Sequence, residues 1–429
     1  MAPIRLGLAV AMLTLGVLAG RAQEDGPPAE ALVRHGLLAL QARDLPTAQE
    51  YLERAVATDP DEPRGWIGLA RTYSMLNLHA QASRHAAEAA RLGGEDTVIQ
   101  HALAMFHINY GNWAEAAAWE ERFARQSGQD REAYLRAVSL YLQADMPKRA
   151  LKVGQDALEH GESAPLHNLL GKAYAIAGDP ERGLQHLRLA VEQGPYEESV
   201  HYDLGYFHLR QQDFDAATTA FQAGSKYFDK SAALEIGLGI AAYGQRSFKT
   251  AVGHFLRAAE LAPALEQPHA FLGRILQHAP DRMEEVVARM KIFYSDHSKT
   301  HFGPFLYGQA LLAKLKASRD KAAMARIESL LRESIERNGE YWESHYELGV
   351  LLEKKRDFAA AEEHLERAVA LNPDSSKPHY RLARVYQRLG KAGEARRARE
   401  LHKQIAERER QAMQAGDLPA EFSDAGSTP

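Results

Sequence analysis

Three residues near position 300 have side chains of the kind that bind transition metals. They are Asp296, His297 and His301, in the stretch DHSKTH. Carboxylate oxygens and imidazole nitrogens are typical zinc ligands, but a structural zinc site needs four of them. No further ligand lies close by in the sequence. We therefore expect these side chains to pack or to face solvent, and we predict no metal and no other cofactor.

Catalytic signatures are absent from the sequence. The run GLGIAAYG, from Gly237 to Gly244, is not a dinucleotide fingerprint, because its third glycine is too far on and no strand is expected before it. There is no nucleophile elbow, no HExxH, no phosphate-binding loop and no cysteine. The neighbouring carboxylates Glu284 and Glu285 form no recognisable pair of acid and base. The sequence therefore predicts no catalytic residues and a protein that is not an enzyme.

Charge and composition narrow the classes of partner. The chain has 52 basic and 57 acidic side chains, a net charge of −5, with 45% hydrophobic and 25% charged residues. These are the values of an ordinary folded protein, and they give no overall field that would attract nucleic acid. We predict a protein or peptide partner and no nucleic acid.

A repeat of about 34 residues organises the chain. Most of the starts of its eleven units are 34 residues apart. The starts are Ala29, Pro63, Thr97, Arg131, Ala164, Glu198, Ala232, Glu266, His301, Trp342 and Ser376.

The same residue types recur at fixed positions of the unit. The eighth position is small, as in Gly205, and the twentieth is small, as in Ala217. The twenty-fourth is often large and apolar, as in Phe221, and a proline such as Pro373 closes several units. Small residues allow two helices to touch, and proline marks the turn after a helix. Each unit is predicted to be a helix, a turn and a second helix.

Two segments carry this pattern most completely. They are HYDLGYFHLRQQDFDAATTAF, from His201 to Phe221, and HYELGVLLEKKRDFAAAEEHLERAVALNP, from His345 to Pro373. Both resemble the tetratricopeptide repeat family, and the resemblance covers about residues 29 to 410. It implies an all-α solenoid, a right-handed superhelix of about eleven helix-turn-helix repeats, whose first helices line a concave groove.

The resemblance also implies which residues line that groove, namely those at the second, fifth, ninth, twelfth and thirteenth positions of a unit. In the middle of the chain these positions form an aromatic strip with polar anchors, which we predict to bind the partner. The alternative for each side chain is packing between neighbouring units. The candidates are Asn168, Lys172, Tyr202, Tyr206, Arg210, Ile236, Ile240, Tyr243, Arg274, Phe302, Phe305 and Gln309.

Members of the family that bind chaperones hold a terminal carboxylate with lysine at the fifth and asparagine at the ninth position of one unit. No unit here has that pair, and Asn168 with Lys172 reverses it. A carboxylate clamp is therefore not expected.

Five histidines fall at the fourth position of their units, where the family often has an aromatic residue. We interpret them as part of the repeat and not as metal ligands. They are His167, His201, His269, His345 and His379.

Two consecutive units depart from the pattern. The unit from Glu266 has Glu285 at its twentieth position, and the next unit carries about seven extra residues, around Lys314 to Ala323. A distortion is expected there, either a hinge or a lengthened helix. We accordingly divide the array into about eight repeats in residues 29–300, and an irregular repeat, two regular repeats and a capping helix in residues 301–412.

Both ends of the chain differ from the repeats. Residues 1–22 are predicted to be a signal peptide, with Arg5 before the apolar run Leu6 to Leu18, followed by a linker at 23–28. A retained membrane anchor is the alternative, and no transmembrane segment is expected after signal removal. Residues 413–429 are predicted to be disordered.

The segment from Lys377 to Arg410 has eleven basic and four acidic residues. This local excess could dock on an acidic surface, or it could serve only as the polar face of an end cap.

Together these features predict a non-catalytic scaffold for protein interaction, exported to the periplasm or secreted, with envelope assembly as one setting. Two alternatives stay open. One is a subunit that recruits a catalytic partner, and the other is a purely structural array that oligomerises.

Overall fold

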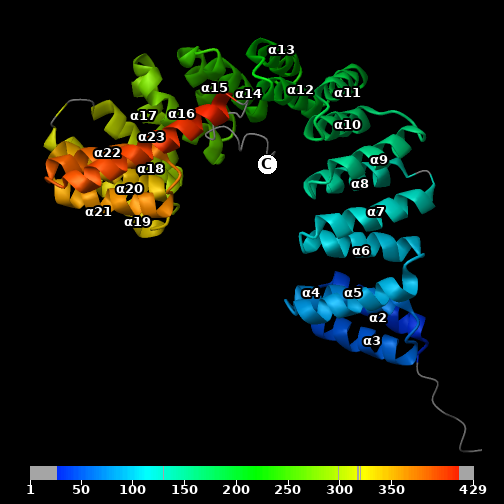
Figure 1. The fold of residues 1–429 in the computed structure, drawn as a ribbon. Helices are drawn as coiled ribbons and strands as arrows, with labels where there is room; N and C mark the ends of the chain where they lie inside the picture. Colours follow the sequence, from blue (N-terminus) through cyan, green and yellow to red (C-terminus); the bar gives the residue numbers. More distant parts are fainter. Residues whose placement is uncertain (1–26, 129, 298, 316–317, 319, 415–429) are drawn as a thin grey trace, which may run out of the picture. The chain divides into compact units, whose positions relative to one another are not determined.

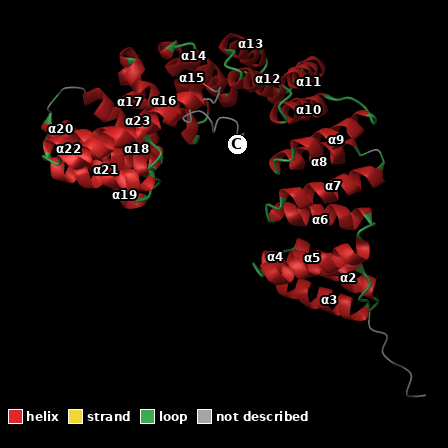
Figure 2. Cartoon of the chain, viewed as in Figure 1, coloured by secondary structure: helices red, strands yellow, loops and turns green. Residues whose placement is uncertain are grey.

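The computed structural model describes residues 27–414, apart from 129, 298, 316, 317 and 319. The predicted signal peptide lies outside the described residues, as does nearly all of the predicted disordered tail. Over the described residues the chain is all-α, as predicted (Figure 2).

The chain divides into two compact units, one up to Gly183 and one from Leu184. Figure 1 shows the helices of each following one another in pairs. The first unit contains α2 (Ala29–Gln41), α3 (Leu45–Thr58), α4 (Pro63–Met75), α5 (His79–Gly93), α6 (Thr97–Asn109), α7 (Trp113–Ser127), α8 (Arg131–Gln143), α9 (Pro147–Leu158) and α10 (Ala164–Ile176). Helix α11 (Pro180–Gln193) includes the division between the units.

The second compact unit continues the pairs. It contains α12 (Glu198–Arg210), α13 (Phe214–Ser225), α14 (Ala232–Gly244), α15 (Phe248–Leu261), α16 (Glu266–Ile275), the short 3-10 helices η2 (Leu276–His278) and η3 (Pro280–Arg282), α17 (Met283–Asp296), α18 (Phe302–Leu315), α19 (Lys321–Arg337), α20 (Trp342–Lys355), α21 (Phe358–Leu371), α22 (Ser376–Arg388) and α23 (Ala392–Gln414).

The helix boundaries confirm the register of the repeat. Each predicted start except His301 is the first residue of a helix, and α18 begins one residue after His301. We call the helix that opens a repeat its first helix, and the next its second helix.

The first helix of a regular repeat ends in a left-handed residue at the fifteenth position. Glycine has a positive φ there in some repeats, as at Gly178, but arginine, asparagine, aspartate or glutamine does in others, as at Arg356 with φ 66°. A left-handed residue stops the helix and lets the chain turn back into the second helix. The repeats from Glu266 and His301 have no positive φ at this position.

Packing within and between repeats depends on a side chain from the second helix. A Cβ atom at Gly205 would lie 2.5 Å from the ring of Phe221, and a Cβ atom at Gly237 equally close. The ring therefore sits between α12 and α14, which belong to successive repeats. Leu52 lies in the same way against Gly36 and Gly68.

Polar side chains join successive repeats. The hydroxyl of Tyr73 donates to Glu53 at 2.7 Å, and that of Tyr386 donates to Glu366 at 2.7 Å. In both cases a tyrosine at the eleventh position reaches a glutamate at the twenty-fifth position of the preceding repeat. These bonds cross the repeat boundary near the surface, where they complement the apolar contacts.

The repeat from Glu266 is distorted, as predicted. Helix α16 stops at Ile275, and two 3-10 helices occupy the turn before α17. The twentieth residue, Glu285, is exposed and accepts hydrogen bonds from Arg282 at 2.7 and 2.6 Å. Helices α16 and α17 contact each other far less than the paired helices of the regular repeats do.

The next repeat accommodates its extra residues in two places. The connection between Leu315 and Lys321 is long, and α19 has 17 residues. A lengthened helix therefore accommodates some of the extra residues of this repeat. Within the second compact unit, the apolar core continues through these repeats from Tyr202 to Ala398. The domain boundary expected at residue 300 stays a prediction.

The left-handed turn residue predicts a stabilising substitution. Arg356→Gly should raise the melting temperature, with a gain of about 0.5–1 kcal/mol in unfolding free energy, because glycine adopts a positive φ without the steric cost that arginine has. Circular dichroism melting tests this. The control is Arg397→Gly, inside α23, which should lose about 1 kcal/mol. A lower melting temperature for Arg356→Gly would contradict the argument.

Candidate functional site

The twelve residues predicted to bind the partner all lie on first helices. Asn168 and Lys172 are on α10 in the first compact unit, and the others are in the second. There they are distributed over α12 (Tyr202, Tyr206 and Arg210), α14 (Ile236, Ile240 and Tyr243), α16 (Arg274) and α18 (Phe302, Phe305 and Gln309).

Five of the twelve are buried in the core. Ile236, Ile240 and Phe305 belong to the apolar cluster of the second unit, together with Tyr202. Burial raises the pKa of the Tyr202 hydroxyl, because the ionised form would lose its hydration. Asn168 is buried in α10. These residues support the fold, and a partner at the surface would not reach most of their atoms.

The remaining residues are partly or fully exposed. Tyr206 stacks on Tyr202 with ring centroids 6.3 Å apart, and Tyr243 packs on Phe248 at 5.5 Å. Phe302 lies against Tyr341 at 5.3 Å. Each aromatic ring is anchored on one side by a neighbouring ring, so a contacting partner would meet a rigid surface.

A polar cluster on α18, α20 and α22 contains, besides the predicted Gln309, residues that were not predicted. The Gln309 amide donates to Glu347 at 3.0 Å across two first helices. Glu343 and Tyr346 occupy the second and fifth positions of their repeat, so the positional rule applied to the last repeats would have found them. Glu347 and Arg381 stand at the sixth position, which that rule does not include.

Glu343 is the most unusual member of this cluster. Its Oε2 atom is buried and has no hydrogen-bond donor among the described residues. Burial raises the pKa of the carboxyl, although a bond from its own backbone N–H and the charges of Arg274 and Lys377 oppose the rise. Burial also raises the pKa of Glu347, against the bond from Gln309. The two carboxyls lie one turn apart on α20.

Arg381 is already engaged. Its guanidinium donates to Glu353 at 3.2 Å, and Arg384 lies 3.0 Å from the same carboxylate. Burial raises the pKa of Tyr346, and a hydrogen bond with Arg381 acts in the opposite direction. Arg381 therefore ties α22 to α20 and is not available to complete Glu343.

Comparison with known proteins decides the family. A tetratricopeptide repeat model matches residues 39–106 and 352–415, and a second model of the same description matches residues 202–266 and 312–376. Together the matched ranges cover more than half of the chain. The chain belongs to the tetratricopeptide repeat family.

Individual relatives are distant. The BBSome complex member BBS4 of Bos taurus is 24% identical over 196 residues, which are 46% of this chain and 38% of that protein. The chain thus spans well under two thirds of that relative's length. Among solved structures, yeast Tom70 has 14% identity and a TM-score of 0.44, covering 90% of this chain and 94% of its own. The Cut9–Hcn1 hetero-tetramer of APC/C has 13% identity and a TM-score of 0.41, covering 98% and 99%.

One buried charge in the first unit occupies a core position of the tetratricopeptide repeat. Glu120 stands at the twenty-fourth position, where five of the other repeats have leucine or phenylalanine, and its side chain is fully buried. It accepts a hydrogen bond from Arg136 at 2.5 Å and lies 3.3 Å from Nδ1 of His101. Because both oxygens have partners, the fold itself compensates this charge.

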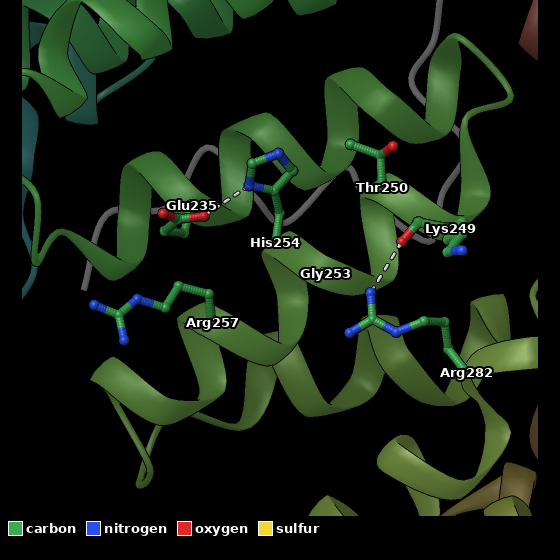
Figure 3. Close-up of a pocket in the computed structure, with 7 residues that line it drawn as sticks. All are labelled: Glu235, Lys249, Thr250, Gly253, His254, Arg257 and Arg282. Atoms are coloured by element: carbon green, nitrogen blue, oxygen red, sulfur yellow. Dashed lines mark hydrogen bonds and ion pairs between the residues drawn. The ribbon is translucent and has the colours of Figure 1, made fainter.

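A surface cleft of about 510 Å³ lies beside α15 (Figure 3). Its basic side chains do not point toward one common position at which a ligand could bind. Arg257 and Lys249 lie at opposite ends of the cleft in Figure 3, and Arg282 is bound to Glu285 and to the Lys249 carbonyl oxygen. The residues lining it are Glu235, Lys249, Thr250, Gly253, His254, Arg257 and Arg282.

The histidines of the tetratricopeptide repeats have structural roles. Nε2 of His201 bonds the Pro195 carbonyl oxygen at 2.9 Å, and Nε2 of His379 bonds that of Pro373 at 3.1 Å. Each bond closes the turn between repeats. His297 packs on Phe293 and bonds its carbonyl oxygen. Across residues 27–414, as far as they are described, no three His, Asp or Glu side chains are grouped to hold a metal ion.

No helix within the described ranges combines the length and apolar character needed to cross a membrane.

We predict that the buried His269 makes the folded protein less stable in acid. Its Nδ1 bonds the Leu265 carbonyl oxygen at 2.9 Å, its buried Nε2 has no partner in the described structure, and burial lowers its pKa to about 4. The folded state holds the neutral form. The stability it contributes is therefore present above pH 6.5 and is lost as the pH falls towards 4, by on the order of 3 kcal/mol.

Melting temperatures of wild type and His269→Leu between pH 7.5 and 4.5 test this, because other groups titrate in both proteins. The wild type should lose more stability than the variant. Substitution of the exposed His35 with leucine is the control and should leave the wild-type profile. Parallel profiles for wild type and His269→Leu would refute the prediction.

Proposed function

We propose that this protein is a non-catalytic scaffold that binds a polypeptide partner on the first helices of its second compact unit. The tetratricopeptide repeat family generally mediates protein interactions and is generally non-catalytic. One observation supports the location most directly. Tyr206, Tyr243 and Phe302 stay partly exposed, although each is held by another aromatic ring.

The physical argument concerns the cost of ordering a surface. A side chain already held by its neighbours loses little conformational entropy when a partner binds, so its contact area contributes more fully to affinity. Tyrosine adds a hydroxyl that can hydrogen-bond. Anchored aromatic residues with polar neighbours are the usual centre of a protein interface.

Partner binding should depend on Tyr206 and Tyr243. The double substitution Tyr206→Ala with Tyr243→Ala should reduce crosslinked capture of the partner from native cells by about tenfold or more, while helix content stays unchanged. The control is Tyr196→Ala with Tyr227→Ala. These rings are 75% and 51% exposed and pack on each other at 5.0 Å, on turns of the same compact unit. Equal loss in both variants would count against the proposed surface.

We also propose that the protein is exported, on the basis of the basic Arg5 followed by a short apolar run. Mass spectrometry of the protein from native cells should find a chain lacking residues 1–22 in the exported fraction. An intact amino terminus in the membrane fraction would favour the retained anchor. An intact amino terminus in the cytosol would contradict export.

A further inference from the structure

The last described pair of helices, α22 and α23, carries basic side chains on one common face. The segment from Lys377 to Arg410 has eleven basic and four acidic residues. Residues three or four positions apart on a helix lie next to each other on its surface. We call the face that five such basic residues form the terminal basic face. It consists of the exposed residues Arg384 and Arg388 on α22 and Arg396, Arg399 and Lys403 on α23.

Contacts between the two helices bring both halves of this face together. Arg399 donates a hydrogen bond to the side-chain oxygen of Gln387, which lies one turn from Arg384 on α22. The guanidinium of Arg384 lies over the ring of Tyr380, with 5.8 Å to the ring centroid. That ring packs in turn on His402 of α23 at 5.3 Å. The basic residues of α22 and α23 therefore share one surface.

This surface lies where a further repeat would pack. Arg399 stands at the twenty-fourth position of its repeat, which is the position of Phe221 in an earlier one. Phe221 reaches the next first helix, against Gly237. After α23 no further helix is described, and the residues of the terminal basic face are exposed. A partner can therefore reach all of them.

The chain leaves most of this charge uncompensated. Arg388, Arg396 and Lys403 have no hydrogen-bond or ion-pair partner among the described residues. Glu400 and Glu407 lie one turn further along α23, but they accept hydrogen bonds from other side chains of that helix. The positive field of the face is therefore open to a ligand.

Like charges on this face oppose the fold. Arg384 with Arg388, and Arg399 with Lys403, are pairs four residues apart, and like charges at that spacing destabilise a helix. The end of an array needs only a polar surface, which side chains of both signs provide without this repulsion. An anionic partner explains the single sign of the face better than capping does, because its charge relieves the repulsion.

The residue types and their spacing favour the carboxylates of a polypeptide. A guanidinium binds a carboxylate through two parallel hydrogen bonds. Successive turns of α22 are about 5.4 Å apart, and alternate side chains of an extended polypeptide are about 6.6 Å apart, so the two spacings are similar. A helix that lies on a lipid surface inserts an apolar stripe. Among the described residues of α22 and α23, Leu401 is the only large aliphatic side chain that is exposed.

We propose that the terminal basic face binds an acidic segment of a polypeptide, whose aspartate or glutamate carboxylates pair with its arginine and lysine side chains. This inference goes beyond the proposed function, because Tyr206 and Tyr243 lie on other helices, α12 and α14. The chain then has two separate binding surfaces.

Fluorescence anisotropy tests this with the purified full chain and a labelled hexadecapeptide in which aspartate alternates with serine. The triple substitution Arg388→Gln, Arg396→Gln and Lys403→Gln should weaken binding by about tenfold or more, because it removes three separate ion pairs. A peptide with asparagine in place of aspartate should lose binding to the wild type to a similar extent.

The matched control removes the same charge elsewhere. The triple substitution Lys148→Gln, Arg149→Gln and Lys152→Gln changes exposed residues of α9, in the first compact unit, and should alter binding by less than about twofold. Circular dichroism should find the same helix content in both triple variants. An equal loss of binding in both would show that the peptide follows net charge, and would refute the terminal basic face as its site.

Two other outcomes would overturn the proposal. If the aspartate and asparagine peptides bind equally well, the face does not recognise carboxylates. If vesicles of phosphatidylcholine and phosphatidylglycerol bind the wild type and the aspartate peptide does not, the partner is a lipid surface and the assignment to a polypeptide is wrong. The double substitution Tyr206→Ala with Tyr243→Ala should bind the aspartate peptide like the wild type, so the failure of one proposal leaves the other standing.

Discussion

The array depends on one steric interaction, in which a large side chain from a second helix is inserted between two successive first helices. Phe221 lies against Gly205 and Gly237 in this way, and the geometry requires that neither glycine carry a Cβ atom. The first helices α12 and α14 can then approach each other, so their outward side chains lie on adjacent helices of the same compact unit. The packing that stabilises the repeat therefore also determines where a partner can be met.

The distorted repeat shows the consequence of removing this interaction. At Gly273 the space for a Cβ atom is occupied by Gln309, from the next first helix, and not by a side chain of α17. Helix α16 accordingly packs more on α18 than on α17. This arrangement fixes Gln309, whose amide then reaches Glu347. The irregularity of one repeat thus positions a polar group in the next.

The fold was predictable to the extent that its steric requirements restrict residue types. Small residues at fixed positions gave the register, and the helices begin where that register placed them. The left-handed turn residue was not visible, because Arg356 and Gln212 adopt it as well as glycine does. A backbone conformation that several residue types can adopt at modest cost leaves little trace in a single sequence.

The candidate site was predictable only in part. Positional rules place a residue on the correct helix, but exposure also depends on the neighbouring repeats, and this is why Ile236 and Ile240 are in the core while Tyr243 is not. The cluster around Glu343 depends on contacts between residues some 30 to 40 positions apart, such as Gln309 with Glu347. No local pattern records such a contact.

Two buried carboxylates differ in how completely the chain supplies their oxygens with hydrogen-bond donors. Glu120 is fully enclosed, and the chain supplies a partner to each of its oxygens. Glu343 has an oxygen that no described residue completes. A carboxylate that serves only the fold gains nothing from an incomplete shell, since an apolar residue of similar size would avoid the desolvation cost. Glu343 stands in the first turn of α20, where a bond from its own backbone N–H and the helix dipole offset part of that cost.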